Sequence, residues 1–114
     1  PPHVPKPLVD PEFEIDAELA AVGAGEYGKC SGCHGSGMYS SGYAPDLRAS
    51  IIPIELESLR DIVKNGARVD KGMPAFPEIT DEQLKALQHY IRHRANQTLP
   101  EYEAWQSKKD MASN

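Results

Sequence analysis

Two cysteines and a histidine stand close together in Cys30-Ser31-Gly32-Cys33-His34. In a helical turn, thiols at this spacing meet the two vinyl groups of one porphyrin edge and become thioethers, so the pattern is the attachment signature of c-type haem. His34 then lies beneath the iron, where one imidazole nitrogen binds the metal and the other donates to a backbone carbonyl. The pentapeptide predicts one haem c, held covalently through Cys30 and Cys33 and ligated by His34.

The same residues have two other chemical interpretations. A cysteine pair at this spacing is also a thiol redox motif, but that motif belongs beside a strand-helix-strand unit, and the chain shows no convincing strands. Together with His89 and His93 the pair could bind structural zinc, in which case the protein would be colourless. The gap between the cysteines and the histidines is several times that of a zinc finger. Haem is therefore favoured over both.

A methionine is the candidate for the second axial ligand. Met38 follows His34 by four residues, too few to carry it to the opposite face of a porphyrin, and Met111 belongs to a polar tail. Met73 lies 39 residues beyond His34, between a glycine and a proline that can hold an irregular backbone against the ring. We predict His34 and Met73 as the iron ligands. The alternatives are that Met73 only fills the core, or that the sixth site is open, as in a gas sensor or peroxidase.

Three helices are expected to position these groups. The first covers residues 16–27 and begins at Asp16, a favoured N-cap residue. The second has apolar residues at helical spacing from Leu56 and ends at Gly66, and the third opens with a capping box at Thr80-Asp81-Glu82-Gln83. Its buried stripe contains Leu84, Leu87 and Ile91.

The two ends of the chain differ in composition from this middle part. Five of the first eleven residues are proline, which favours an extended linker or an ordered arm over residues 1–15. Residues 16–96 form the predicted domain, and residues 97–114 a polar C-terminal extension, for which a helical turn packed by Tyr102 and Trp105 is expected.

Composition limits the classes of function. With 114 residues, 39% of them hydrophobic, the chain has little apolar material for a core, and a buried porphyrin would supply the rest. A formal net charge of -5 argues against nucleic acid and favours partners with basic patches. No run is long enough to span a membrane, and no signal peptide is evident, so a mature or excised chain is expected.

The order of helix, Cys-x-x-Cys-His, proline loop, middle helix, Gly-Met-Pro and terminal helix resembles that of class I cytochromes c. The resemblance implies an all-α fold, a small wrap around one covalently attached haem. It also implies that the first helix crosses the last, so that Gly23 and Tyr27 meet Leu87, Tyr90 and Ile91. In such a fold Pro45 offers its carbonyl to His34.

A closer resemblance lies in Ala44-Pro45-Asp46-Leu47-Arg48 and Gly72-Met73-Pro74-Ala75-Phe76. Both segments resemble the C-terminal haem domain of quinohaemoprotein (PQQ-dependent) alcohol dehydrogenases. There the arginine matching Arg48 contacts a haem propionate, which suits a guanidinium that binds carboxylates bidentately; a plain surface arginine is the alternative. Further haem contacts are expected from Tyr43, Ile51, Ile52 and Phe76.

The resemblance implies a one-electron carrier and not an enzyme, because the propeller that binds quinone and calcium in those dehydrogenases has no counterpart in this chain. Attachment of haem c in this family implies a bacterial periplasmic location. The carrier is expected to be a monomer as isolated, and a redox partner or a fused dehydrogenase domain is expected beside it. A free diffusible cytochrome is the alternative.

Overall fold

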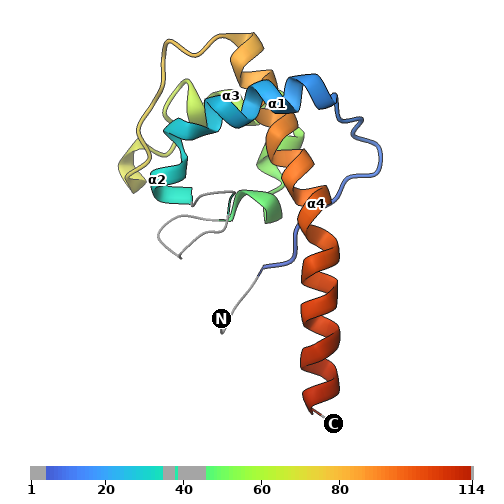
Figure 1. Cartoon of the computed structure of the whole chain (residues 1–114). Helices are drawn as coiled ribbons and strands as arrows, with labels where there is room; N and C mark the ends of the chain where they lie inside the picture. Colours follow the sequence, from blue (N-terminus) through green and yellow to red (C-terminus); the bar gives the residue numbers. More distant parts are fainter. Residues whose placement is uncertain (1–4, 35–37, 39–45, 114) are drawn as a thin grey trace.

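A computed structural model describes residues 5–34, 38 and 46–113, apart from the side chains of Cys33 and Ser113. Every regular element in these residues is helical (Figure 1), which confirms the all-α prediction. In chain order the elements are α1 Ala17–Glu26, η1 Tyr27–Lys29, α2 Ser31–His34, η3 Leu47–Ala49, η4 Ile52–Ile54, α3 Leu56–Val63, η5 Val69–Lys71 and α4 Asp81–Ser113, where η denotes a short 3-10 helix. In this part of the chain no helix has both the length and the apolar character needed to cross a membrane.

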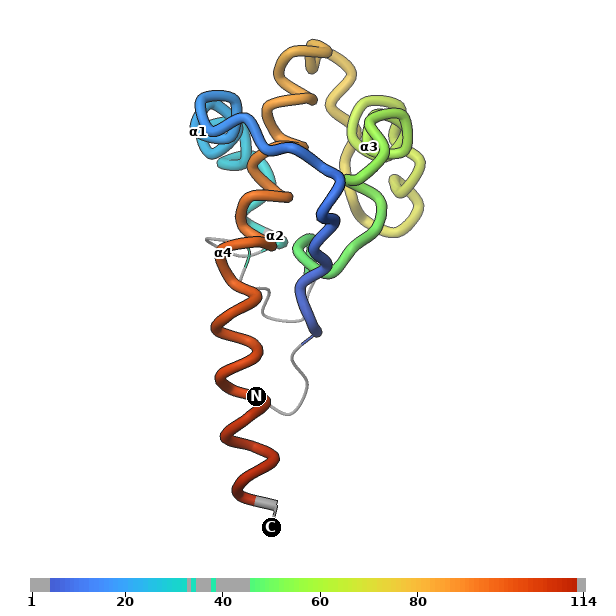
Figure 2. Tube along the Cα trace, turned by 90° about the vertical axis from the view of Figure 1, so that its right-hand side faces the viewer, coloured from blue at the N-terminus to red at the C-terminus, as the bar shows by residue number. Residues whose placement is uncertain are grey.

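Helix α1 begins where the sequence predicts. The carboxylate of Asp16 accepts hydrogen bonds from the backbone N–H groups of Glu18 at 3.0 Å and Leu19 at 3.1 Å, as an N-cap residue should. The helix lies across the upper half of α4 (Figures 1 and 2). Gly23 is at the crossing point, where a Cβ atom would stand only 1.9 Å from the carbonyl oxygen of Ala86. The predicted close crossing of the first and last helices is therefore confirmed.

Helix α3 packs on the opposite side of α4 from α1 (Figure 2). Its apolar face contributes Leu59 and Val63, each 4% exposed, to the core. The chain leaves this helix through Gly66, whose φ of +76° is the left-handed conformation that glycine adopts readily. After η5 the chain returns to α3, because the backbone N–H of Phe76 donates to the carbonyl of Val63 at 2.7 Å. The loop that carries Met73 is thereby fixed at both ends.

Helix α4 opens with the predicted capping box. The N–H of Thr80 donates to the side chain of Gln83 at 2.9 Å, and the N–H of Gln83 donates to the Thr80 hydroxyl at 3.1 Å. Its first half forms the centre of the core, where Leu84, Leu87 and Ile91 are at most 3% exposed.

The second half of α4 corrects the expectation of a single helical turn. The helix continues to Ser113 and includes Pro100 in its interior. A proline removes one helical hydrogen bond without forbidding the helix, and the Thr98 hydroxyl donates to the carbonyl of Arg94 at 2.7 Å just before it. The last turns project from the body (Figure 1), with the rings of Tyr102 and Trp105 5.8 Å apart.

The described part of the proline-rich segment is an ordered arm. Pro7 is buried, and the N–H of Leu8 donates to the carbonyl of Arg48 at 2.8 Å. Further along, the rings of Phe13 and His89 are 4.9 Å apart. Residues 5–15 thus lie along the body of the molecule before α1 begins (Figure 2).

Candidate functional site

A cavity of about 520 Å³ lies among α2, η3, η4, α3, α4 and the loop after η5. Aliphatic and aromatic side chains form most of its wall. These are Leu47, Ile52, Pro53, Leu59, Ile62, Val63, Phe76, Leu87 and Ile91. Its size and apolar character suit a small-molecule or cofactor site.

Two residues of the Cys-x-x-Cys-His motif line one side of this cavity. Cys30 is half-buried, and His34 is 7% exposed at the end of α2. The turn that presents them is fixed by the His34 N–H, which donates to the carbonyl of Cys30 at 3.0 Å. The side chain of Cys33 lies outside the described residues.

Tyr27 packs beside this turn as part of the core. Burial in the first place, and the neighbouring Cys30 thiol in the second, raise the pKa of the Tyr27 phenol far above its ordinary value. The phenol therefore stays protonated and neutral next to the cavity. Its ring centroid lies 5.4 Å from that of Tyr90, a contact implied by the family resemblance.

Met73 and Phe76 line the cavity from the loop after η5. Gly72 has a φ of +94°, and the Met73 N–H donates to the carbonyl of Arg68 at 3.2 Å, so a tight turn presents the thioether. The other two methionines are elsewhere: Met38 is fully buried in the core and does not line the cavity, and Met111 is 74% exposed.

Arg48 is buried, which removes the interpretation of a plain surface arginine. Its guanidinium donates to both carboxylate oxygens of Asp46, at 3.0 and 2.6 Å, while its neighbour Leu47 lines the cavity. The two isoleucines expected to contact the haem differ in their positions. Ile52 lines the cavity, whereas Ile51 is 70% exposed and does not. Tyr43 and Pro45 lie outside the described residues.

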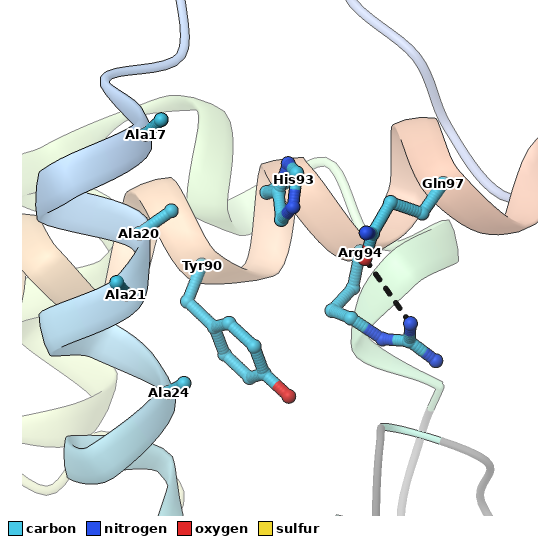
Figure 3. A pocket seen from close by; sticks show the side chains of 8 residues that line it. All are labelled: Ala17, Ala20, Ala21, Ala24, Tyr90, His93, Arg94 and Gln97. Atoms are coloured by element: carbon cyan, nitrogen blue, oxygen red, sulfur yellow. Dashed lines mark hydrogen bonds between the residues drawn. The ribbon is translucent and has the colours of Figure 1, made fainter.

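The structure places the histidines of the zinc interpretation apart from the cavity. The Nδ1 atom of His89 accepts the Asp16 N–H at 3.0 Å, at the start of α1. His93 instead borders a second, open hollow of about 480 Å³ over the crossing of α1 and α4 (Figure 3). That hollow is lined by Ala17, Ala20, Ala21, Ala24, Tyr90, His93, Arg94 and Gln97. Within the described ranges no three His, Cys, Asp or Glu side chains gather as a metal site.

Sequence reasoning missed the charged residues around the cavity. Lys29, Arg68 and Lys71 are among the lining residues, and no acidic residue of the described chain is. It also missed Arg92, which is 2% exposed beside the cavity-lining Ile91. The signal for Arg92 was available, because position 92 falls eight residues after Leu84 and so on the same apolar face.

One family accounts for this arrangement. The sequence model of the family described as cytochrome c oxidase, cbb3-type, subunit III, matches residues 18–91. The chain belongs to this cytochrome c domain family. It therefore binds haem c, and the predictions of a class I c-type cytochrome and of an electron-transfer domain without a catalytic site of its own are confirmed.

Curated relatives of this cytochrome domain are redox proteins. It is 40% identical over 70 residues to the dehydrogenase subunit of a quinone alcohol dehydrogenase from Gluconobacter oxydans (strain 621H), and 34% identical over 94 residues to quinohemoprotein alcohol dehydrogenase ADH IIB from Pseudomonas putida. It is also 40% identical over 67 residues to lupanine 17-hydroxylase [cytochrome c] from a Pseudomonas species.

These matches cover 60%, 81% and 58% of this chain in the same order. They cover 9%, 13% and 10% of the respective relatives, so the cytochrome domain spans about a tenth of each one.

The cavity residues of the cytochrome domain fit a haem. An imidazole and a thiol come from one wall and a thioether comes from another, and all three line an apolar enclosure that can bury a porphyrin. His34 belongs to α2 and Met73 to the loop after η5, so their side chains are independent potential ligands. The donor set is soft and nitrogen-containing, as haem iron in electron-transfer sites requires.

Proposed function

We propose that this domain holds one haem c covalently through Cys30 and Cys33, with His34 and Met73 as axial ligands, and transfers single electrons. The observation that carries the proposal is the cavity lined by His34 from α2 and by Met73 from the loop after η5. When bound, the haem supplies an iron that accepts and releases one electron without changing its ligands.

The protein side of this function is positioning and exclusion of water. The turn bonded from His34 to Cys30 and the tight turn at Gly72 fix the two ligand-bearing segments, so little rearrangement accompanies electron transfer. The aliphatic wall keeps water from the iron, and the thioether of Met73 favours the reduced state. A high reduction potential for a haem protein follows.

The setting we propose is the bacterial periplasm, with a dehydrogenase as redox partner, either on the same polypeptide or as a separate protein. This rests on the relatives, whose names include two alcohol dehydrogenases, and on the small share of each that the domain spans. In that setting Arg48 is proposed to contact a haem propionate, exchanging part of its pairing with Asp46 for the ligand carboxylate. Phe76 and, from the family resemblance, Tyr43 and Pro45 complete the haem surroundings.

Absorption spectra of the haem-loaded protein test the proposal. We expect split bands on reduction and a weak sulfur-to-iron band at the red end in the ferric form. Met73→Leu should abolish that weak band and allow carbon monoxide to bind the reduced protein. Met111→Leu, which changes an exposed methionine, should leave the spectrum as it is.

Covalent attachment has its own readout. Haem should remain with the protein on a denaturing gel, and Cys30→Ala or Cys33→Ala should weaken that retention. A native protein that lacks the red band and binds carbon monoxide would instead identify an open site of the sensor or peroxidase kind, and would remove Met73 as ligand.

A further inference from the structure

Arg92 joins three parts of the molecule from inside α4. Its side chain donates to the carbonyl of Leu8 at 2.8 Å, to that of Ser50 at 3.3 Å and to that of Arg48 at 3.5 Å. The residue is 2% exposed. Within the part of the chain that the structure describes, the hydrogen-bond acceptors of Arg92 are backbone oxygens, which is unusual because a charge taken from water needs compensation from well-placed partners.

The N-terminal arm closes this arrangement. Residues 5–10, here called the strap, include the buried Pro7, and the Leu8 N–H donates to the same Arg48 carbonyl at 2.8 Å. Leu8 therefore donates to Arg48 and accepts from Arg92, while Arg92 also reaches Arg48. Three segments far apart in the sequence are bonded to one another in a closed loop of contacts.

The segment held in this way is a wall of the cavity. Leu47 and Ser50 line the cavity, and the carbonyls of Arg48 and Ser50 are the ones that Arg92 binds from behind. Ile52 and Pro53 continue the wall. We propose that Arg92 is a positioning residue which, together with the strap, holds wall residues 46–50 closed over the haem and so sets the reduction potential. This rests on the proposed function of the cavity.

The chemistry of the side chain explains why arginine stands here. The guanidinium is a rigid fork with donors on two ends, and it reaches carbonyls of two segments at once, which a lysine cannot match. Burial lowers the pKa of Arg92, and the charge of Asp10 in the strap opposes that effect, yet arginine stays protonated in proteins. Burying an apolar side chain here would cost less desolvation free energy, but it would leave the carbonyls of Leu8 and Ser50 without this donor.

Two effects of this arrangement both raise the reduction potential of the iron. A closed wall excludes water, and water would favour the more highly charged ferric state. A buried cation near the site also disfavours the ferric state. Loss of either should lower the reduction potential, and loss of the strap alone should do so without any change of charge.

The test compares reduction potentials of haem-loaded variants, measured by titration with optical detection. Arg92→Gln removes the charge and the fork. Leu8→Pro removes the backbone N–H that donates to Arg48 and exchanges the partly buried leucine side chain for a proline ring, but it keeps the Leu8 carbonyl and every charge, so it is the milder change. Arg94→Gln, two residues further along α4, is the matched control.

We expect both Arg92→Gln and Leu8→Pro to lower the potential, and the double variant to lie no lower than the lower of the two single variants. Arg92→Lys, which keeps the charge but not the fork, should fall between the native protein and Arg92→Gln. Arg94→Gln should keep the native potential.

If Leu8→Pro keeps the native reduction potential, or if the shifts add in the double variant, the proposal that the strap holds the wall closed is wrong. Unchanged potentials in Arg92→Gln with lowered stability would leave Arg92 a purely structural residue and would also overturn it. The spectrum of the native protein decides the proposed function separately: with the split bands and red band present, a missing shift of potential counts against the strap alone.

Discussion

His89 shows how a residue that could bind metal instead holds the fold. Its Nδ1 atom accepts the N–H of Asp16 at 3.0 Å, so this nitrogen carries no proton in the folded state, and its ring packs near Phe13. Burial first, and then the charge of Lys85, lower the pKa of His89, while Asp16 opposes them. The folded protein therefore favours the neutral ring more than the unfolded chain does.

This residue predicts a loss of stability in mild acid. Between the unfolded pKa near 6.5 and the lower folded pKa, the unfolded chain binds more protons, so stability falls as the pH drops through that window. His89→Gln, whose amide oxygen can still accept a hydrogen bond, should flatten this part of the profile. We expect the native protein to lose stability that the variant keeps, as measured by denaturant unfolding between pH 7 and 5.

His93→Gln is the matched control for this profile, because it removes a histidine from the same helix and leaves the bond to Asp16 in place. It should retain the native acid sensitivity. Equal slopes for the native protein and for His89→Gln would show that His89 does not cause the acid loss.

At this scale the sequence predicts cavity residues well where chemistry dictates their spacing. Cys30 and His34 line the cavity because the motif itself is a cofactor pattern, and Met73 does so because glycine and proline flank it. The helical spacing from Leu84 could have predicted that Arg92 is buried, but its carbonyl partners and the pairing of Arg48 with Asp46 could not be predicted, since each depends on carbonyls or a turn supplied by the tertiary fold.

At the scale of elements, the crossing of α1 and α4 depends on a missing side chain. A Cβ on Gly23 would overlap the Ala86 carbonyl oxygen at 1.9 Å and approach the Tyr90 Cβ to 2.8 Å. Both neighbours are fixed, one as backbone and the other at the base of its side chain. The two helices would have to move apart to admit a methyl group.

Gly23→Ala should therefore lower the free energy of unfolding by about 1–3 kcal/mol, the range for overpacking in a core. Gly25→Ala is the control, because nothing lies within 4 Å of its Cβ position and alanine is the better helix former. We expect Gly25→Ala to be neutral or slightly stabilising in the same denaturant titration. Equal losses in the two variants would contradict a specific close contact at Gly23.

The boundaries of the helices can be predicted where local side chains cap the helix, and the prediction fails where the local sequence is ambiguous. The Asp16 cap and the capping box at Thr80 mark the two helix starts, because each is satisfied by side chains within three residues. The C-terminal segment differs from its prediction, because its polar residues gave no sign of a long helix and a proline such as Pro100 is typical of a helix end. The residues beyond Pro100 are nevertheless good helix formers, and the helix passes through.

For the molecule as a whole, the charges around the cavity have the opposite sign to the net charge of the chain. The chain has 17 acidic and 12 basic side chains, which favoured partners with basic patches. Around the cavity, however, the charged lining residues are Lys29, Arg68 and Lys71. Asp70, the acid of η5, is exposed and does not line it. Such an arrangement could not be predicted, because Lys29 is far in the sequence from Arg68 and Lys71 and only the fold brings them to one cavity.

This local charge predicts how small redox ions react. Reduced haem-loaded protein should be oxidised by ferricyanide at a rate that falls as salt is added, because the cations attract the anion. Lys71→Gln should slow the reaction roughly twofold to fivefold at low ionic strength and should speed oxidation by the cationic tris(phenanthroline)cobalt(III) complex. Stopped-flow absorption measures both rates.

Lys108→Gln, an equal change of charge on the projecting part of α4, should alter neither rate appreciably. If Lys71→Gln and Lys108→Gln slow ferricyanide equally, the reaction responds only to net charge, and electrons do not leave beside Lys71.

The 33 residues of α4 extend along the 52 Å longest dimension of the molecule, and Pro100 divides them. Lacking an N–H, Pro100 donates no helical bond to the turn before it, so the ladder of hydrogen bonds is interrupted there. Fraying that starts at the C-terminal turns meets this interruption before it reaches the half that carries Leu87 and Ile91. The part of α4 after Pro100 can thus unfold, or change its contacts, without changing the part that carries the cavity-lining Leu87 and Ile91.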